Sequence, residues 1–153
     1  MKRSNLMVCT CVLLLATCLT ALGVDDAAKG DLALMQGEWT MVSGERGGMQ
    51  MPANIVATGR RVCKDDQVTV NVGGMLIMKA TFTVDASKSP KTIDYDVKDG
   101  PSKGKKQLGI YELNGDTLKF CFAEPDQPRP DSFETKAGDG RTLSVWKKAA
   151  KQD

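Results

Sequence analysis

Apolar and polar residues alternate over several short stretches of this chain, which is the pattern of β-strands with one buried face. The clearest stretch is LIMKATFTV, residues 76–84, whose second face is mostly polar. Its apolar face carries five residues: Leu76, Met78, Ala80, Phe82 and Val84. The same period recurs in four further groups: Val68, Val70 and Val72; Ile93, Tyr95 and Val97; Leu118, Phe120 and Phe122; and Leu143 and Val145. These groups predict a protein built mainly of strands.

Turn signals separate the predicted strands. Gly73-Gly74 and Asn114-Gly115 indicate two-residue hairpins, because both central residues of such turns take positive φ. Residues 98–106 and 124–131 predict loops, the second being too rich in proline to pair as a strand.

The strand count and the short connections predict an all-β fold over residues 32–148. Residues 107–113 are apolar on both faces, and Gly109 within them indicates a bend or a close neighbour. About eight strands result, arranged as an antiparallel meander that either closes into a barrel or folds into a sandwich. Closure is favoured because it removes the exposed edges of such a meander.

A short helical turn is expected just before the first strand. Asp31 is a candidate N-cap, and the turn carries Leu32, Leu34 and Met35. After Gly37 the period changes to two, with Trp39 and Met41 on one face.

Residues 1–23 have the composition of a secretory signal peptide. Lys2 and Arg3 precede an uncharged apolar run, and Ala21-Leu22-Gly23 fits a cleavage site. Residues 24–31 are then a short linker and residues 149–153 a C-terminal tail. A retained membrane anchor is an alternative, and so is a lipoprotein modified at Cys18, although Thr17 departs from the residues usual before a lipidated cysteine. We therefore expect an exported protein, periplasmic or extracellular, that touches a membrane only if lipidated.

Removal of the signal leaves a formally neutral chain. The full sequence has 21 Lys and Arg against 19 Asp and Glu, and cleavage removes Lys2 and Arg3 to leave 19 of each. A neutral chain lacks the excess of positive charge by which proteins bind nucleic acid.

We expect the protein to be a monomer.

Two cysteines, Cys63 and Cys121, remain after cleavage. On the predicted strand order they lie on the second and seventh strands, three strand spacings or about 14 Å apart around a closed barrel. A disulfide needs Cα atoms within about 7 Å. Alternation also points Cys121 away from the apolar face of its strand. The two thiols are therefore predicted not to be bonded.

A short helical turn followed by Gly-x-Trp on the first strand of an eight-stranded meander resembles the lipocalin and calycin pattern. The resemblance implies that Gly37 and Trp39 belong to the closed floor of the barrel. It also implies a basic residue over the tryptophan ring, for which Arg141 is the first candidate and Lys147 the second.

Longer stretches resemble an uncharacterised secreted domain family of planctomycete bacteria, usually described as lipocalin-like. They are LMQGEWTMVSGERGG, DGPSKGKKQLGIYELNGDTLKFCFAEPDQPRP and SFETKAGDGRTLSVWKK. The resemblance spans residues 32–148 and implies a fold and a compartment, but no activity.

The chain contains no histidine, which excludes Ser-His and Cys-His nucleophile systems and histidine-ligated zinc. Asp94 and Asp96 share a strand face at a spacing near that of acid/base pairs, but an outward polar face explains them better. The lysines of 98–106 indicate a solvated loop or a weak anion site. We predict no enzyme activity, no catalytic residues, no cofactor and no metal.

Residues 44–60 join the first two strands by a long connection that contains the segment Met49-Gln50-Met51. Thioethers bind Cu(I), yet methionine also forms adaptable apolar surface. In the lipocalin architecture this connection lies across the open mouth, so the candidate ligand-binding residues are Met49, Met51, Ile55 and Val56. The hypothesis is a binding module for a small apolar molecule or a cell-envelope component. The alternative is a structural or protein-interaction module whose barrel is filled by its own side chains.

Overall fold

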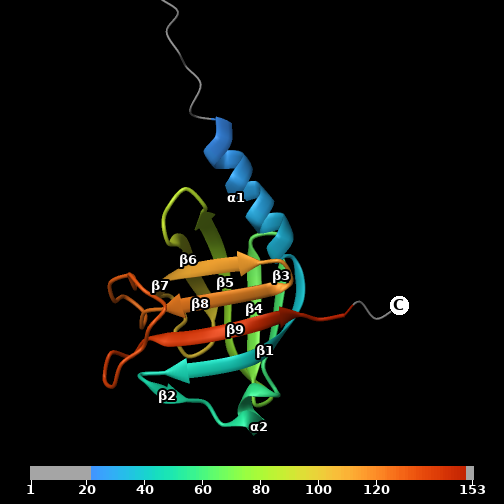
Figure 1. The fold of residues 1–153 in the computed structure, drawn as a ribbon. Helices are drawn as coiled ribbons and strands as arrows, with labels where there is room; N and C mark the ends of the chain where they lie inside the picture. Colours follow the sequence, from blue (N-terminus) through green and yellow to red (C-terminus); the bar gives the residue numbers. More distant parts are fainter. Residues whose placement is uncertain (1–21, 151–153) are drawn as a thin grey trace, which may run out of the picture.

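The computed structural model describes residues 22–150 of the protein, shown as a ribbon in Figure 1. The predicted signal peptide up to residue 21, with Cys18, lies outside the described residues, as do residues 151–153. The elements in chain order are α1 (Leu22–Met35), β1 (Gly37–Arg46), β2 (Met49–Gln50), α2 (Ala53–Val56), β3 (Arg60–Lys64), β4 (Gln67–Val72), β5 (Met75–Asp85), β6 (Lys91–Asp99), β7 (Lys106–Asn114), β8 (Thr117–Phe122) and β9 (Thr142–Lys148).

Eight strands form a closed antiparallel barrel, as the alternation predicts. Neighbouring strands pair in the order β1, β3, β4, β5, β6, β7, β8 and β9, and β9 pairs back onto β1 from Trp39 with Lys148 to Arg46 with Thr142. The two-residue β2 adds a small hairpin to the end of β1. Closure pairs the backbone N–H and C=O groups of the first and last strands with each other, whereas a sandwich would leave the groups of its edge strands unpaired.

The barrel interior is lined by most of the predicted apolar faces. The prediction for β9 was wrong: Ser144 and Trp146 face the interior there, because they pair with Phe120 and Leu118, whereas Leu143 and Val145 lie on the outer face. On β6, Ile93, Tyr95 and Val97 are buried and the residues between them are more exposed. Gly73 and Gly74 both take positive φ, as their predicted hairpin requires. The second predicted hairpin, between β7 and β8, turns at Gly115-Asp116, one residue later than predicted. The period of two therefore locates most of the core, and one of these two predicted turns is displaced by a residue.

The N-terminal helix is longer than the single turn predicted. α1 covers 14 residues, including the predicted linker, because Ala27, Ala28 and Leu32 favour helix. Asp31 lies inside α1 and is not its N-cap. Its carboxylate instead lies 2.7 Å from Lys91 Nζ and accepts a hydrogen bond of 2.6 Å from the Tyr111 hydroxyl, which fixes the helix against the barrel.

The β8–β9 loop, residues 123–141, covers the outer face of the neighbouring strands. Arg129 Nη1 donates to the carbonyls of Ile93 and Gly109, at 3.2 and 2.7 Å. Ile110 and Cys121, which point out of the barrel, are buried rather than exposed. This cover explains why 107–113 is apolar on both faces.

Cys63 and Cys121 are free, as predicted, and both are buried. Cys63 belongs to the interior core, whereas the Cys121 thiol lies 3.8 Å from the Glu134 carbonyl in the β8–β9 loop. Burial also raises the pKa of the Cys121 thiol, which disfavours the reactive thiolate.

We expect thiol labelling of the unreduced, denatured protein, followed by peptide mapping, to find both Cys63 and Cys121 modified. Labelling of the native protein should leave both unmodified over the same time, because each is buried. A crosslinked peptide that joins the two cysteines would contradict the strand order.

Candidate functional site

Trp39 closes the end of the barrel next to α1. Its ring is fully buried, and its indole Nε1 donates to the Met35 carbonyl at 2.9 Å, at the end of the helix. Gly37, with φ of +96°, provides the backbone turn between helix and strand that a side chain would strain. The floor expected from Gly37 and Trp39 is therefore present in the structure.

The cation over the Trp39 ring is Lys148 and not Arg141. Lys148 Nζ lies 4.8 Å from the ring centroid and donates to the Leu34 carbonyl at 2.8 Å. β9 begins just after Arg141 and pairs antiparallel with β1, so Arg141 enters at the far end, about 20 Å from Trp39. Lys147, the second candidate, points outward to Asp116, at 3.7 Å.

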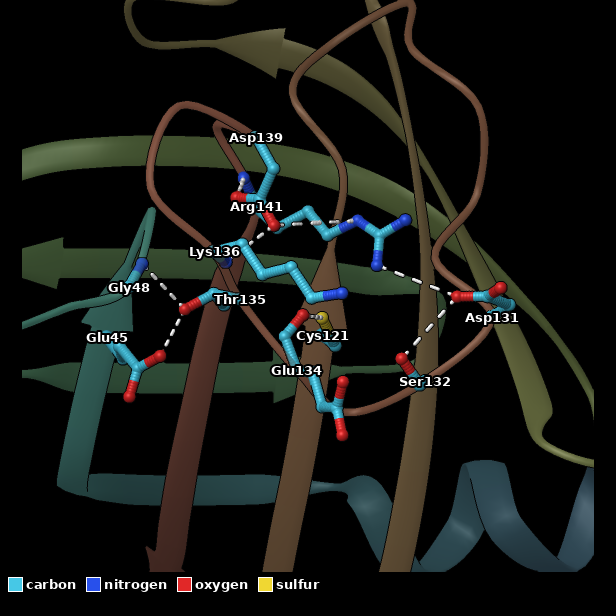
Figure 2. Close-up of polar contacts among 10 residues, drawn as sticks. All are labelled: Glu45, Gly48, Cys121, Asp131, Ser132, Glu134, Thr135, Lys136, Asp139 and Arg141. Atoms are coloured by element: carbon cyan, nitrogen blue, oxygen red, sulfur yellow. Dashed lines mark hydrogen bonds and ion pairs between the residues drawn. The ribbon is translucent and has the colours of Figure 1, made fainter.

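Arg141 organises the β8–β9 loop instead (Figure 2). Its guanidinium lies 3.6 Å from the Asp131 carboxylate and 4.0 Å from that of Asp139. In the same view Thr135 joins this loop to the β1–β2 hairpin, because its hydroxyl donates to Glu45 and accepts from the backbone N–H of Gly48 at 2.9 Å.

The segment 49–59, called the lid below, carries the four predicted ligand-binding residues. Met51 and Val56 pack against the barrel core, and Ile55 is half-buried. Met49 points away from the barrel, with 74% of its surface exposed. Three of the four residues thus lie at or near the barrel, and Met49 does not.

Two glycines allow close packing where the lid contacts the barrel, because a side chain at either position would clash with a methionine. A Cβ atom on Gly44 would lie 2.5 Å from the Met51 sulfur, and one on Gly59 would lie 2.5 Å from Met41 Cβ. α2, within the lid, has no buried residue and no side-chain N-cap. The lid is therefore held by Met51 and Val56, which pack against the core, and by backbone hydrogen bonds, such as that from Met51 N to the Gly44 carbonyl at 2.8 Å.

The barrel interior contains a charged side chain, Arg61 of β3, which is 2% exposed. The guanidinium carbon lies 4.3 Å from the centroid of the Phe120 ring and 5.7 Å from that of Tyr95. These rings belong to β8 and β6, each three strands around the barrel from β3, so the side chain reaches across the interior. Cys63 lies beside it on β3.

Tyr95 is the second buried polar group of the interior. Burial raises its pKa to about 12, although the neighbouring Arg61 charge acts in the opposite direction. Its hydroxyl is therefore neutral at physiological pH and can donate a hydrogen bond. We call Arg61, Cys63, Tyr95 and Phe120 the Arg61 cluster.

Sequence patterning missed the Arg61 cluster because Arg60-Arg61-Val62-Cys63 has only one aliphatic residue, and that residue points outward. Val62 is 41% exposed, while Arg61 and Cys63 face the core. The alternation of side chains along a strand does place Arg61 and Cys63 on the same face. That this face points into the barrel becomes evident only when the pairing of Arg61 with Trp39 is known.

Two surface clefts lie outside the barrel wall. The larger, about 530 Å³, lies between the β5–β6 turn and Arg129-Pro130, and the smaller, about 260 Å³, lies along the lysine-bearing β6–β7 loop. An aspartate near each cleft lies beside a cation: Asp94 is 2.6 Å from Arg129, at an angle outside that of a hydrogen bond, and Asp96 is 3.4 Å from Lys106. The two aspartates therefore contact different cations and do not form an acid/base pair.

Within residues 22–150, no group of three or more Cys, Asp or Glu side chains is arranged to hold a metal ion. No helix among these same residues has the length and apolar character needed to cross a bilayer. Comparison with family models, curated proteins and solved structures returned no match for this chain.

Proposed function

We propose that this protein is an exported, non-enzymatic binding module that takes a small apolar ligand, or an apolar part of a cell-envelope component, into the barrel under the lid. Periplasmic or extracellular location, with or without a lipid at Cys18, and a monomeric state belong to the same proposal. The resemblance to the planctomycete secreted family supports the location.

The lid is the observation that carries this proposal. It ends the barrel opposite the Trp39 floor, and Met51 enters the barrel over a glycine. Methionine has three rotatable bonds and repacks at low cost, so a ligand can replace its side chain. α2 within the lid has no buried residue, and segments with few buried apolar contacts open first.

A structural or protein-interaction module is the second candidate. Both clefts described above lie outside the barrel, and the interior is occupied by large side chains such as Trp39, Tyr95 and Phe120. This filled interior favours a barrel that is complete without a ligand.

Dye binding separates the two candidates. We expect the native protein to bind the neutral hydrophobic dye Nile red, and Met51→Glu to abolish the fluorescence without unfolding the barrel, because the carboxylate places a charge at the mouth. Circular dichroism monitors the fold.

Met49→Glu is the matched control, since Met49 lies in the same segment but points into solvent. It should leave dye binding unchanged. If the native protein binds no dye, or if both substitutions act equally, the filled-barrel module becomes the better description.

A further inference from the structure

Arg61 holds a positive charge in the barrel interior for which the described residues supply no counter-ion. No carboxylate of residues 22–150 lies within ion-pair distance of its guanidinium. Arginine stays protonated even when it is buried, because its pKa remains far above physiological pH in proteins. Burial of an unpaired charge is costly, and buried charges in proteins are normally paired.

The aromatic rings beside Arg61 compensate the charge only in part. Phe120 and Tyr95 attract the cation through their faces, but a ring face does not replace a hydrogen-bond acceptor. Nε and Nη2 of Arg61 are buried and make no hydrogen bond of normal geometry, and neither does the hydroxyl of Tyr95, although this hydroxyl lies beside the guanidinium. The interior thus contains three unsatisfied polar atoms from two side chains.

The two unpaired nitrogens lie on the same edge of the guanidinium. The N–H bonds of Nε and Nη2 run parallel on that edge, and their spacing matches the two oxygens of a carboxylate. A single cation balances one negative charge, whereas a phosphate dianion needs more positive charge than the interior offers. The hydroxyl of Tyr95 adds a third donor for the same anion.

We propose that Arg61 and Tyr95 bind the carboxylate of an amphipathic ligand, whose apolar part lies between the Arg61 cluster and the lid. This inference rests on the proposed binding function and adds the chemical class of the ligand: an apolar chain or ring system with one carboxylate. Arg61 supplies both the charge and the bidentate hydrogen bonds, and Met51 yields its place to the apolar part.

The test compares decanoate with decanol, which have the same chain length but differ in the charged group. We expect the full-length protein to bind decanoate about 10–100-fold more tightly than decanol, the range that corresponds to hydrogen bonds with a charged partner. Displacement of Nile red and isothermal titration measure the two affinities.

Arg61→Met should remove the preference for decanoate and leave the affinity for decanol unchanged. It should also shift the urea midpoint of the ligand-free protein upward, because it removes an uncompensated buried charge. Arg46→Met is the matched control: Arg46 lies on β1, its side chain is 65% exposed, and its ion pair with Glu124 is on the surface. This control should keep the preference.

Tyr95→Phe removes only the hydroxyl and keeps the ring, so it tests the site even if Arg61→Met fails to fold. It should weaken decanoate several-fold and leave decanol unchanged. Equal binding of decanoate and decanol by the unmodified protein would overturn the carboxylate site and leave the apolar binding function standing. Absence of binding by both probes would overturn the binding function itself.

Discussion

Trp39→Ala is expected to lower the free energy of unfolding by about 3–5 kcal/mol, as deletion of a large aromatic side chain from a core does. The ring is fully buried, it closes the floor of the barrel, and its indole N–H is bonded to the Met35 carbonyl. Alanine would leave a cavity between α1 and the barrel. Urea denaturation followed by circular dichroism measures the loss.

Lys148→Met is the companion substitution for Trp39→Ala. It removes the cation above the ring but leaves the ring in place, and an exposed cation–π contact contributes only about 0.5–1 kcal/mol. A loss of less than about 1 kcal/mol in the free energy of unfolding for Trp39→Ala would show that the ring is not part of the core. It would contradict the assignment of Trp39 to the floor of the barrel.

Gly109→Ala is expected to cost about 2–3 kcal/mol, the upper part of the range for overpacked cores. A Cβ atom at this position would lie 2.3 Å from the Phe122 ring and 3.0 Å from the Cys121 carbonyl. Phe122 has little freedom to move, because it stacks on Tyr95 with ring centroids 4.5 Å apart. The backbone of Gly109 is not at positive φ, so the penalty is steric alone.

Gly30→Ala is the matched control for this substitution. Gly30 lies within α1 and has no neighbouring atom within 4 Å of an added Cβ. Alanine there should raise stability by about 0.5–1 kcal/mol, since glycine in a helix loses more backbone entropy on folding. Equal effects of the two substitutions would show that Gly109 is not in close contact with the Phe122 ring.

The Arg61 cluster and the stability of the barrel are connected. A core selected for stability alone would contain an aliphatic residue at position 61, because an unpaired buried charge is costly. Retention of arginine there is a departure from the pattern of the surrounding core, and such departures are concentrated at functional sites. We therefore expect Arg61→Met to raise the urea midpoint of the protein and, at the same time, to remove its preference for decanoate over decanol.

The alternation of apolar and polar residues was enough to predict most of the strands and to favour a closed barrel over a sandwich. Strict alternation in 76–84 and 93–97 placed the interior faces correctly, because side chains of a strand point to opposite faces with a period of two. The Gly37-x-Trp39 motif located the floor, and the strand order correctly separated Cys63 from Cys121. The faces and the strand order depend on local periodicity and on counting strands, whereas the floor was implied by the resemblance to the lipocalin and calycin pattern.

The charged residues that face the interior, and the partners that they contact, could not be predicted from the local pattern and depend on pairing between distant strands. Arg61 and Lys148 were not recognised in the sequence, and Arg141 was assigned to the wrong end of the barrel. The outcome at these positions depends on register, since pairing of Trp39 with Arg61 and Lys148 sets what lies over the ring and beside it. Register is a relation between residues far apart in the chain, and a single sequence contains no local signal that fixes it.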